Sequence, residues 1–199
     1  VLASTSSVYG AGTESPFKED SHTSRPLSPY AASKKAAETL AYTYHHLYGI
    51  DVSVLRYFTV YGPAGRPDMS VLKFIHAIWQ KEYITLFGNG NGERDFTYID
   101  DIAAGTVAAL KPLGYEIINL GMDKPTVVSD LIVMIETYLG ESARIQRADL
   151  HSADVLATRA DIKLAKTLLG WEPKVSLRKG IGFTIEWYRE NHEWLKAIM

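Results

Sequence analysis

The chain has 199 residues, of which 46% are hydrophobic and 22% are charged, an ordinary globular composition for one domain with a sizeable core. Its formal net charge of -2 gives no basic footprint for nucleic acid or an anionic membrane, and no apolar run approaches the roughly 20 residues of a membrane span. The absence of cysteine excludes disulfides, thiol catalysis and thiolate metal sites and, with no signal-peptide pattern, favours a soluble protein of the cytoplasm.

The chain opens on a short apolar run, Val1–Ala3, which reads as a buried strand and ends in the hydroxyl side chains of Ser4–Ser7. Open α/β sheets place ligand contacts at the carboxyl ends of their strands, although Ser/Thr turns often satisfy only their own backbone. Residues 11–29 then form a long loop, of a length that is often functional. Because the first strand begins abruptly and without an initiator methionine, we expect the chain to be part of a longer protein.

The next segment predicts an alanine-rich helix that is capped by Ser28, contains Pro29 in its first turn, and runs to Tyr48 before Gly49. Tyr30 and Lys34 lie four residues apart and therefore share one face of this helix. A lysine beside a phenol favours the phenolate, so the spacing predicts an acid–base pair. The alternative interpretation is an exposed tyrosine and a solvated lysine.

Residues 52–58 predict a second buried strand, which ends in a polar segment rich in glycine and proline, 59–69. A strand, a helix and a strand in this order form a parallel crossover unit, whose loops fall at the same edge of the sheet. We therefore expect the polar residues that follow both strands to lie close to Tyr30.

Beyond this unit, the hydrophobic spacing predicts helices and short strands in alternation. Helices are expected over 71–81, 127–139 and 177–194, and strands over 83–87 and 116–120. The last helix should turn Ile181, Ile185, Tyr188 and Trp194 inward.

The glycine-rich turn 88–92 is predicted to join strand 83–87 to a partner strand at 94–99 as a hairpin. It is not a dinucleotide fingerprint, because Glu93 occupies the place of the last glycine and no long helix follows. Asp100 or Asp101 is expected to cap a helix that continues through Leu110.

Basic residues recur late in the chain, a pattern that suits an anionic ligand but is more often a solvated face. They are Arg144, Arg147, His151, Arg159 and Lys163. The six histidines are scattered without metal-ligand spacing, so we expect no bound metal.

Several motifs together resemble one family, the extended short-chain dehydrogenase/reductases, and within it the nucleotide-sugar epimerases and dehydratases. The matching segments are Ser4–Gly10, Tyr30-x-x-x-Lys34, Leu55–Pro63, Gly65–Met69, Arg94–Asp101 and Leu169–Pro173. The Gly-Arg-Pro-Asp-Met run at 65–69 is most similar to UDP-glucuronate 4-epimerases.

The resemblance implies an α/β fold with the later strands of a Rossmann-type parallel sheet and a smaller α/β substrate-binding lobe. Residues 1–62, with a return around 94–121, would complete the NAD-binding domain, and 63–199 would form mainly the nucleotide-sugar lobe. The dinucleotide-binding turn and earlier strands, about 120 residues at about 30 per crossover unit, would precede the chain. The 199 residues alone are therefore expected to be inactive.

The resemblance also implies a reaction, the NAD-dependent 4-epimerisation of a UDP-sugar through a 4-keto intermediate. Tyr30 would be the base that takes the 4-OH proton, and Lys34 would activate it and hold the nicotinamide ribose. Thr5 would hydrogen-bond the sugar O4, completing a catalytic set of Thr5, Tyr30 and Lys34. The Tyr30–Lys34 helix would also form the interface of a homodimer.

Other residues are implied as ligand contacts. Tyr57 would join Tyr30 and Lys34 in binding NAD, while Ser6, Ser7, Thr59, Arg66 and Arg94 would bind the substrate. A hydroxyl at Thr59 could contact a C6 carboxylate, and the two arginines would pair with the diphosphate or the uronate. Arg147 is a candidate for a further phosphate contact, and Ala153–Leu156 departs from the Gly-Asp-Val-Pro of many relatives.

Dehydration is disfavoured because it needs an acid and a base beside the threonine, where this chain has two serines, Ser6 and Ser7. Two alternatives stay open. One is another epimerase, dehydratase or reductase of the same family, and the other is a catalytically silent module that binds a sugar nucleotide.

Overall fold

The computed structural model describes residues 1–149 and 157–196. The helices are α1 (Pro29–Tyr48), α2 (Ser70–Gln80), α3 (Ile99–Ala108), α4 (Val128–Leu139) and α5 (Leu177–Leu195). The strands are β1 (Leu2–Thr5), β2 (Val52–Tyr57), β3 (Thr59–Tyr61), β4 (Tyr83–Phe87), β5 (Glu93–Arg94), β6 (Phe96–Tyr98), β7 (Tyr115–Leu120), β8 (Thr126–Val127) and β9 (Arg144–Ala148). A 3-10 turn, Ser6–Tyr9, follows β1, and a π-helical turn, Ala165–Leu169, precedes α5.

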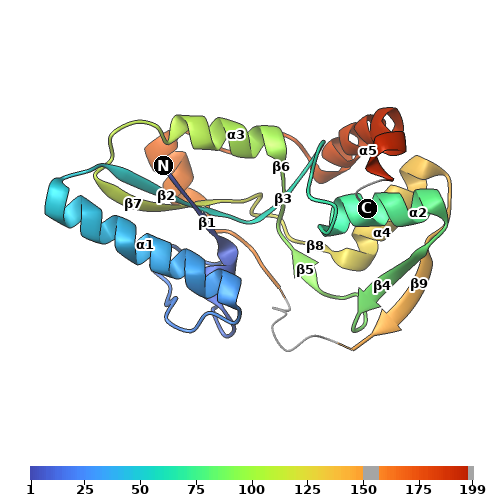
Figure 1. Cartoon of the computed structure of the whole chain (residues 1–199), viewed down its shortest axis with the longest axis horizontal. Coiled ribbons are helices and arrows are strands. Elements are labelled where there is room, and N and C mark those ends of the chain that lie inside the picture. Colours follow the sequence, from blue (N-terminus) through green and yellow to red (C-terminus); the bar gives the residue numbers. More distant parts are fainter. Residues whose placement is uncertain (150–156, 197–199) are drawn as a thin grey trace.

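The first lobe contains a parallel sheet with the strand order β1-β2-β7. Helix α1 connects β1 to β2 and lies on one side of this sheet, while α3 lies on the other (Figure 1). The α/β class and the predicted parallel crossover unit are therefore confirmed. Thr5 and Tyr57 end β1 and β2 at the same edge, so the polar segments that follow these strands lie together.

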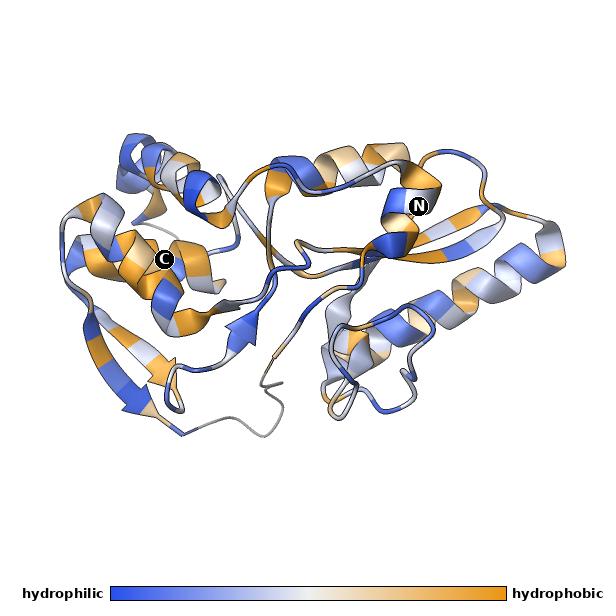
Figure 2. Cartoon of the chain, turned by 180° about the vertical axis from the view of Figure 1, so that it is seen from behind, coloured by the Kyte–Doolittle hydropathy of each residue, from blue (hydrophilic) through white to orange (hydrophobic). Residues whose placement is uncertain are grey.

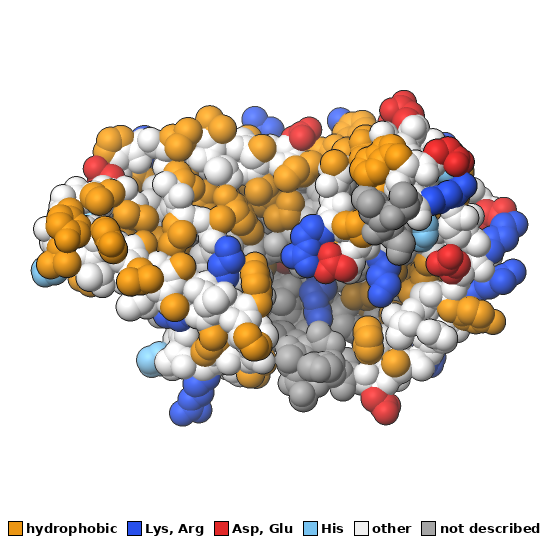
Figure 3. Space-filling model, viewed as in Figure 1, with side chains coloured by type: hydrophobic (Ala, Val, Ile, Leu, Met, Phe, Trp, Pro, Cys, Tyr) orange, Lys and Arg blue, Asp and Glu red, His pale blue; other side chains and the backbone are white. Residues whose placement is uncertain are grey.

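Helix α1 begins and ends where its sequence predicts. The Ser28 hydroxyl accepts a hydrogen bond from the Ala31 N–H at 3.1 Å, and Gly49 ends the helix in the left-handed region with φ 66°. Its buried residues are only Ala31 and Glu38. Much of α1 is blue or white in Figure 2, and Figure 3 shows apolar and tyrosine side chains gathered over its carboxyl-terminal half.

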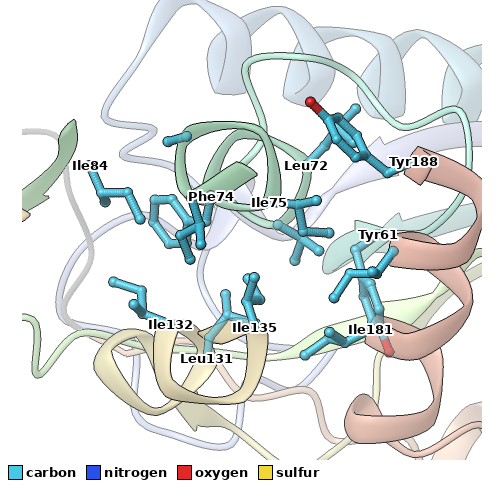
Figure 4. Packing of buried hydrophobic residues seen from close by; sticks show 14 of the residues in the cluster. Tyr61, Leu72, Phe74, Ile75, Ile84, Leu131, Ile132, Ile135, Ile181 and Tyr188 are labelled. Atoms are coloured by element: carbon cyan, nitrogen blue, oxygen red, sulfur yellow. The ribbon is translucent and has the colours of Figure 1, made fainter. Parts of the chain in front are cut away.

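The second lobe is built around a hydrophobic core between α2, α4 and α5 (Figure 4). Phe74 and Ile75 from α2 point toward Leu131 and Ile135 from α4, while Leu72 lies beside Tyr188 of α5. Apolar residues at helical spacing give α2 and α4 these facing sides. A second cluster lies in the first lobe and joins β2, β7 and α3 to the segment around Trp171.

One inward-facing residue of α5 was predicted incorrectly. Ile181, Ile185 and Tyr188 are buried, but Trp194 is 51% exposed and the neighbouring Leu195 is 1% exposed. One residue corresponds to a rotation of about 100° around a helix, so the core takes Leu195 and leaves Trp194 at the surface.

The predicted hairpin between 83–87 and 94–99 is wrong. Strand β4 pairs in parallel with β9, β5 pairs antiparallel with β8, and β6 pairs in parallel with β3. The predicted strand 94–99 is interrupted at Asp95, whose buried carboxylate accepts backbone hydrogen bonds from Met122, Asp123 and Ala160. The residues after Asp95 pair with β3, and β4 pairs with the basic segment 144–148.

The predicted cap of α3 is also wrong. Helix α3 begins at Ile99, so Asp100 and Asp101 lie within its first turn, where they still suit the positive end of the helix dipole. The Asp101 carboxylate accepts hydrogen bonds from the N–H groups of Lys174 and Val175 at 3.0 and 2.9 Å. This residue therefore ties α3 to the segment before α5 rather than capping its own helix.

Thr97, in β6, supplies a stability prediction. Its side chain is 0% exposed, and among the residues that the structure describes no group forms a hydrogen bond with its hydroxyl. Replacing this hydroxyl by a methyl group removes an unpaired buried polar atom at constant shape. We expect Thr97→Val to raise the free energy of unfolding by about 0.5–1 kcal/mol in urea denaturation. A loss above about 1 kcal/mol would reveal a hydrogen bond to this hydroxyl.

Within the described ranges, 1–149 and 157–196, no helix has the length and apolar content needed to cross a membrane.

Candidate active site

A cavity of about 510 Å³ opens at the carboxyl ends of β1 and β2. Its walls come from the residues after β1, the start of α1 and the segment after β2. The lining residues are Ser4–Ser7, Tyr30, Tyr57–Arg66, Met69 and Ile99. The structure thus brings Thr5 and Tyr30 to one cavity, as the crossover unit predicted.

Thr5 ends β1 and begins the 3-10 turn that follows. Its hydroxyl accepts a hydrogen bond from the Ser7 N–H and donates to the Ser7 hydroxyl, both at 3.2 Å. The residue is 7% exposed and lines the cavity. The local turn considered from the sequence is therefore present, and a second acceptor position of this hydroxyl remains available for a ligand.

Tyr30 and Lys34 face the sheet edge together from the first turns of α1. The Lys34 ammonium lies 5.9 Å from the centre of the Tyr30 ring and donates a hydrogen bond to the carbonyl of Ala3 at 3.0 Å. Tyr30 is 52% exposed, so its phenol can reach a ligand in the cavity that it lines. Lys34 is not among the residues that line the cavity, so the cavity itself presents the Tyr30 phenol and the Thr5 hydroxyl, with the ammonium beside the phenol. A phenol and a hydroxyl so placed can exchange a proton with an alcohol and orient it.

The other predicted contact residues divide between two cavities. Ser6, Ser7, Tyr57, Thr59 and Arg66 line the cavity of Thr5 and Tyr30, and the Tyr57 hydroxyl also lies 2.9 Å from that of Thr106. Arg94 instead lines a neighbouring cavity of about 640 Å³ together with Lys73 and the turn 89–92.

Arg66 and Arg94 therefore do not meet in one cavity. The Arg66 guanidinium pairs with Asp68, at 3.0 Å from Nε to Oδ1, and its side chain is 70% exposed. Arg94 donates to the carbonyl of Glu93 at 3.0 Å. Asp68 itself lines the second cavity, so the Arg66–Asp68 pair stands between the two.

Of the basic residues late in the chain that were considered for an anionic ligand, those that the structure describes do not line these two cavities. Arg147 lies exposed on β9, outside the lining of either cavity, and Arg159 and Lys163 pair with Asp123 and Asp161. His151 and Ala153–Leu156 lie outside the described residues. No group of three or more His, Asp or Glu side chains that could hold a metal ion occurs in the described ranges.

The sequence interpretation missed a buried ion pair beneath the site. Glu38 of α1 and Arg56 of β2 are each 1% exposed and are joined by two hydrogen bonds of 2.9 Å. Ser4 donates to the same carboxylate at 2.6 Å. The available signal was a glutamate eight residues after Tyr30, on a helix face that also carries Lys34.

This ion pair predicts how stability depends on pH. Burial alone would raise the pKa of Glu38, but hydrogen bonds from Arg56 and Ser4 outweigh it and hold this pKa below the ordinary 4.5. A carboxyl with a lowered pKa in the folded state stabilises the fold above its unfolded pKa, and this contribution is lost as the pH falls.

We therefore expect the wild type to be more stable than Glu38→Gln at pH 7, with a gap that narrows as the pH falls below about 4.5. Chemical denaturation at a series of pH values measures this gap. Glu141→Gln is the control, because Glu141 is half exposed in its pair with Lys81. A gap for Glu38→Gln that stays constant or widens toward pH 3 would contradict the expectation.

Comparisons with known proteins show which proteins this chain resembles. The chain is 57% identical over 199 residues to a UDP-glucuronate 4-epimerase of Thermodesulfobacterium geofontis strain OPF15, covering 100% of this chain and 61% of that protein. A Bacillus cereus UDP-glucuronic acid 4-epimerase, solved with UDP-glucuronic acid and NAD, has a TM-score of 0.89 at 40% identity, over 94% of this chain and 60% of its own.

A UDP-glucose 4-epimerase of Thermotoga maritima, solved with UDP-glucose, has a TM-score of 0.91 at 31% identity, over 96% of this chain and 63% of its own. The chain therefore spans less than two thirds of these relatives. The family described as NAD dependent epimerase/dehydratase matches residues 1–121. Since this match covers more than half of the chain, the protein belongs to the NAD dependent epimerase/dehydratase family.

Proposed function

We propose that the intact protein is an NAD-dependent nucleotide-sugar 4-epimerase that converts UDP-glucuronate to UDP-galacturonate through a 4-keto intermediate. The observation that carries this proposal is that Thr5 and Tyr30 line one cavity, with Lys34 beside Tyr30. The relatives reported above, two of which are UDP-glucuronate 4-epimerases by name, support the same substrate.

The residues at the cavity fit the nicotinamide end of NAD. An ammonium has three donors, and in the described part of the chain one donor of Lys34 bonds the Ala3 carbonyl, so others can reach ribose hydroxyls. Tyr57 lines the same cavity from the end of β2 and is the third proposed contact. When bound, NAD would accept the hydride from the sugar C4 and return it to the opposite face.

Three residues would handle the sugar 4-hydroxyl. Tyr30 takes the hydroxyl proton while the C4–H bond breaks, and gives a proton back when the alcohol reforms. Lys34 stabilises the Tyr30 phenolate, which exists before the first step and again after the second, whereas Tyr30 is a neutral phenol between them. Thr5 accepts a hydrogen bond from the 4-hydroxyl at its free lone pair, and it can donate one to the ketone oxygen after its proton turns away from the Ser7 hydroxyl.

Substrate specificity would come from the segments after the two strands. Ser6, Ser7 and Thr59 offer hydroxyls to the sugar, and Arg66 offers a planar cation to the C6 carboxylate. In the neighbouring cavity, Arg94 and Lys73 place positive charge where the diphosphate of the nucleotide would lie.

The test is product analysis with the intact protein and NAD. UDP-glucuronate should be converted to an equilibrium mixture with UDP-galacturonate, as measured by chromatography or NMR. A 4-keto-6-deoxy product would identify a dehydratase, and a UDP-sugar that binds without turnover would identify a binding module. No conversion of UDP-glucuronate, with turnover of a neutral UDP-sugar, would contradict the uronate assignment.

The proposal also covers the division of the chain into domains and its assembly with a second copy. Residues 1–62, with a return at 94–121, would complete the NAD-binding domain, and 63–199 would mainly bind the nucleotide sugar. The exposed apolar side chains on the carboxyl-terminal half of α1 (Figure 3) suit a homodimer interface in the cytoplasm. They include Leu40 at 60%, Tyr44 at 54%, Leu47 at 62% and Tyr48 at 67% exposure.

A further inference from the structure

A buried row of polar side chains crosses the parallel sheet one residue before its functional edge. Ser4 of β1, Arg56 of β2 and Asn119 of β7 are neighbours in register. They are 3%, 1% and 0% exposed, respectively. Strands of a parallel sheet covered on both faces are normally apolar at such positions, so this row needs an explanation beyond packing.

Helix α1 binds to this row through one carboxylate. Both Glu38 oxygens accept hydrogen bonds from the Arg56 guanidinium, and Ser4 adds a third hydrogen bond. Arg56 also donates to the carbonyl of Glu19 at 3.1 Å and stacks 4.8 Å from the ring centre of Tyr9, so its own position is fixed. A two-pronged contact between a rigid guanidinium and a carboxylate defines direction as well as distance.

Apolar packing fixes the position of α1 much less strongly than these hydrogen bonds to Glu38 do. Ala31 and Glu38 are the only residues of this helix classed as buried, and alanine can pack in several orientations. The helices of the second lobe are held by rows of isoleucine and leucine instead. Two further hydrogen bonds join α1 to the sheet, from Lys34 to the Ala3 carbonyl and from the Tyr115 hydroxyl to the Glu38 carbonyl, both at 3.0 Å. The Glu38 carboxylate makes the buried, two-pronged contact, so the angle of α1 around its axis depends mainly on this carboxylate.

Each member of the cluster is directly connected to a residue of the proposed site. Ser4 precedes Thr5, Arg56 precedes Tyr57, and Glu38 follows Lys34 by one helical turn and Tyr30 by two. We propose that Glu38 and Arg56 are positioning residues, whose ion pair sets α1 on the sheet so that the Tyr30 phenol is held over Thr5. This inference rests on the proposed epimerase function.

The test must distinguish an effect on the position of Tyr30 from an effect on the stability of the fold. Replacing both members of a buried ion pair by apolar residues of similar size is often neutral for folding, whereas removing one member leaves a buried charge unpaired. The double variant Glu38→Leu/Arg56→Met should therefore lose less stability than either single variant, although it leaves the Ser4 hydroxyl and the Glu19 carbonyl without these partners. Its kcat should fall at least tenfold, since an error of about 1 Å at a reacting group can cost about 100-fold.

The KM for UDP-glucuronate should stay within threefold of the wild type, because Glu38 and Arg56 do not line either cavity. Lys35→Gln is the matched control. Lys35 binds the same carboxylate at 3.2 Å but its side chain is 33% exposed, so kcat should not change. A stable double variant with wild-type kcat, or with a changed KM alone, would overturn the proposal.

A second variant decides the matter if the double variant does not fold. Arg56→Lys keeps the buried charge but cannot bridge both carboxylate oxygens, so kcat should fall several-fold at unchanged KM. Wild-type kcat in this variant would overturn the proposal.

If the wild type itself does not act on a UDP-sugar, the proposed function fails, and amide hydrogen exchange then tests the positioning of α1 without any activity measurement. Residues 29–34 should then exchange faster in Arg56→Lys than in Lys35→Gln, and equal rates would overturn the inference.

Discussion

Replacing Tyr30 by phenylalanine is expected to lower the kcat for UDP-glucuronate by about 10³-fold in the intact protein, within the range of general acid–base catalysis. The substitution removes only the phenolic hydroxyl, so the sugar 4-hydroxyl loses its proton acceptor while Thr5 and Lys34 stay in place. Binding of UDP-glucuronate and NAD, measured by calorimetry, should change by less than about threefold, because little binding energy depends on this one group.

Tyr44→Phe is the matched control for this experiment. Tyr44 lies on the same helix and is 54% exposed, against 52% for Tyr30, but it does not line the cavity. Its loss of a hydroxyl should leave kcat unchanged. Comparable turnover by Tyr30→Phe and the wild type would remove Tyr30 from the chemistry and leave a binding module or another base as the explanation.

The largest loss of stability is expected for Asp95→Ala, about 3–5 kcal/mol. The Asp95 carboxylate is 0% exposed and accepts N–H hydrogen bonds from Met122 at 2.6 Å, Asp123 at 3.1 Å and Ala160 at 2.8 Å. Alanine would leave three backbone donors without this acceptor, a buried one at Ala160 and two partly buried ones at Met122 and Asp123. Each such loss from a buried site costs about 1–3 kcal/mol. Burial raises the pKa of this carboxyl, an effect that the three donors oppose.

Urea denaturation of the intact protein measures this loss. Glu172→Ala is the control, since the Glu172 carboxylate pairs with Lys166 at the surface, where its side chain is 63% exposed. Exposed pairs contribute about 1 kcal/mol or less. A cost for Asp95→Ala no larger than that of Glu172→Ala would show that other contacts hold β6 to the segments around Met122 and Ala160.

Local signals in the sequence predicted the parts of this fold that neighbouring residues control. Ser28, Pro29 and Gly49 fixed α1 within a residue at each end, because capping and left-handed backbone are properties of a few adjacent positions. The placement of Thr5 and Tyr30 at one cavity followed from the parallel crossover unit, because the connection between its two strands is almost always right-handed. The roles of these residues remain predictions from resemblance.

What the sequence could not determine depends on distant partners. The segment at 94–99 reads as the second strand of a hairpin, but Asp95 binds backbone groups 27 to 65 residues away, and no local pattern announces such contacts. Strand β9 was missed because its basic residues read as a solvated face until β4 pairs with it.

The sequence by itself determined the helices, the crossover unit and the candidate acid–base pair, since short-range geometry dictates all three. Only the tertiary structure decided that Arg66 and Arg94 serve different cavities and that Glu38 meets Arg56 beneath the site. The physical reason is that a buried charge is tolerated only opposite its partner, and that partner becomes known only when strands far apart in the chain come into register.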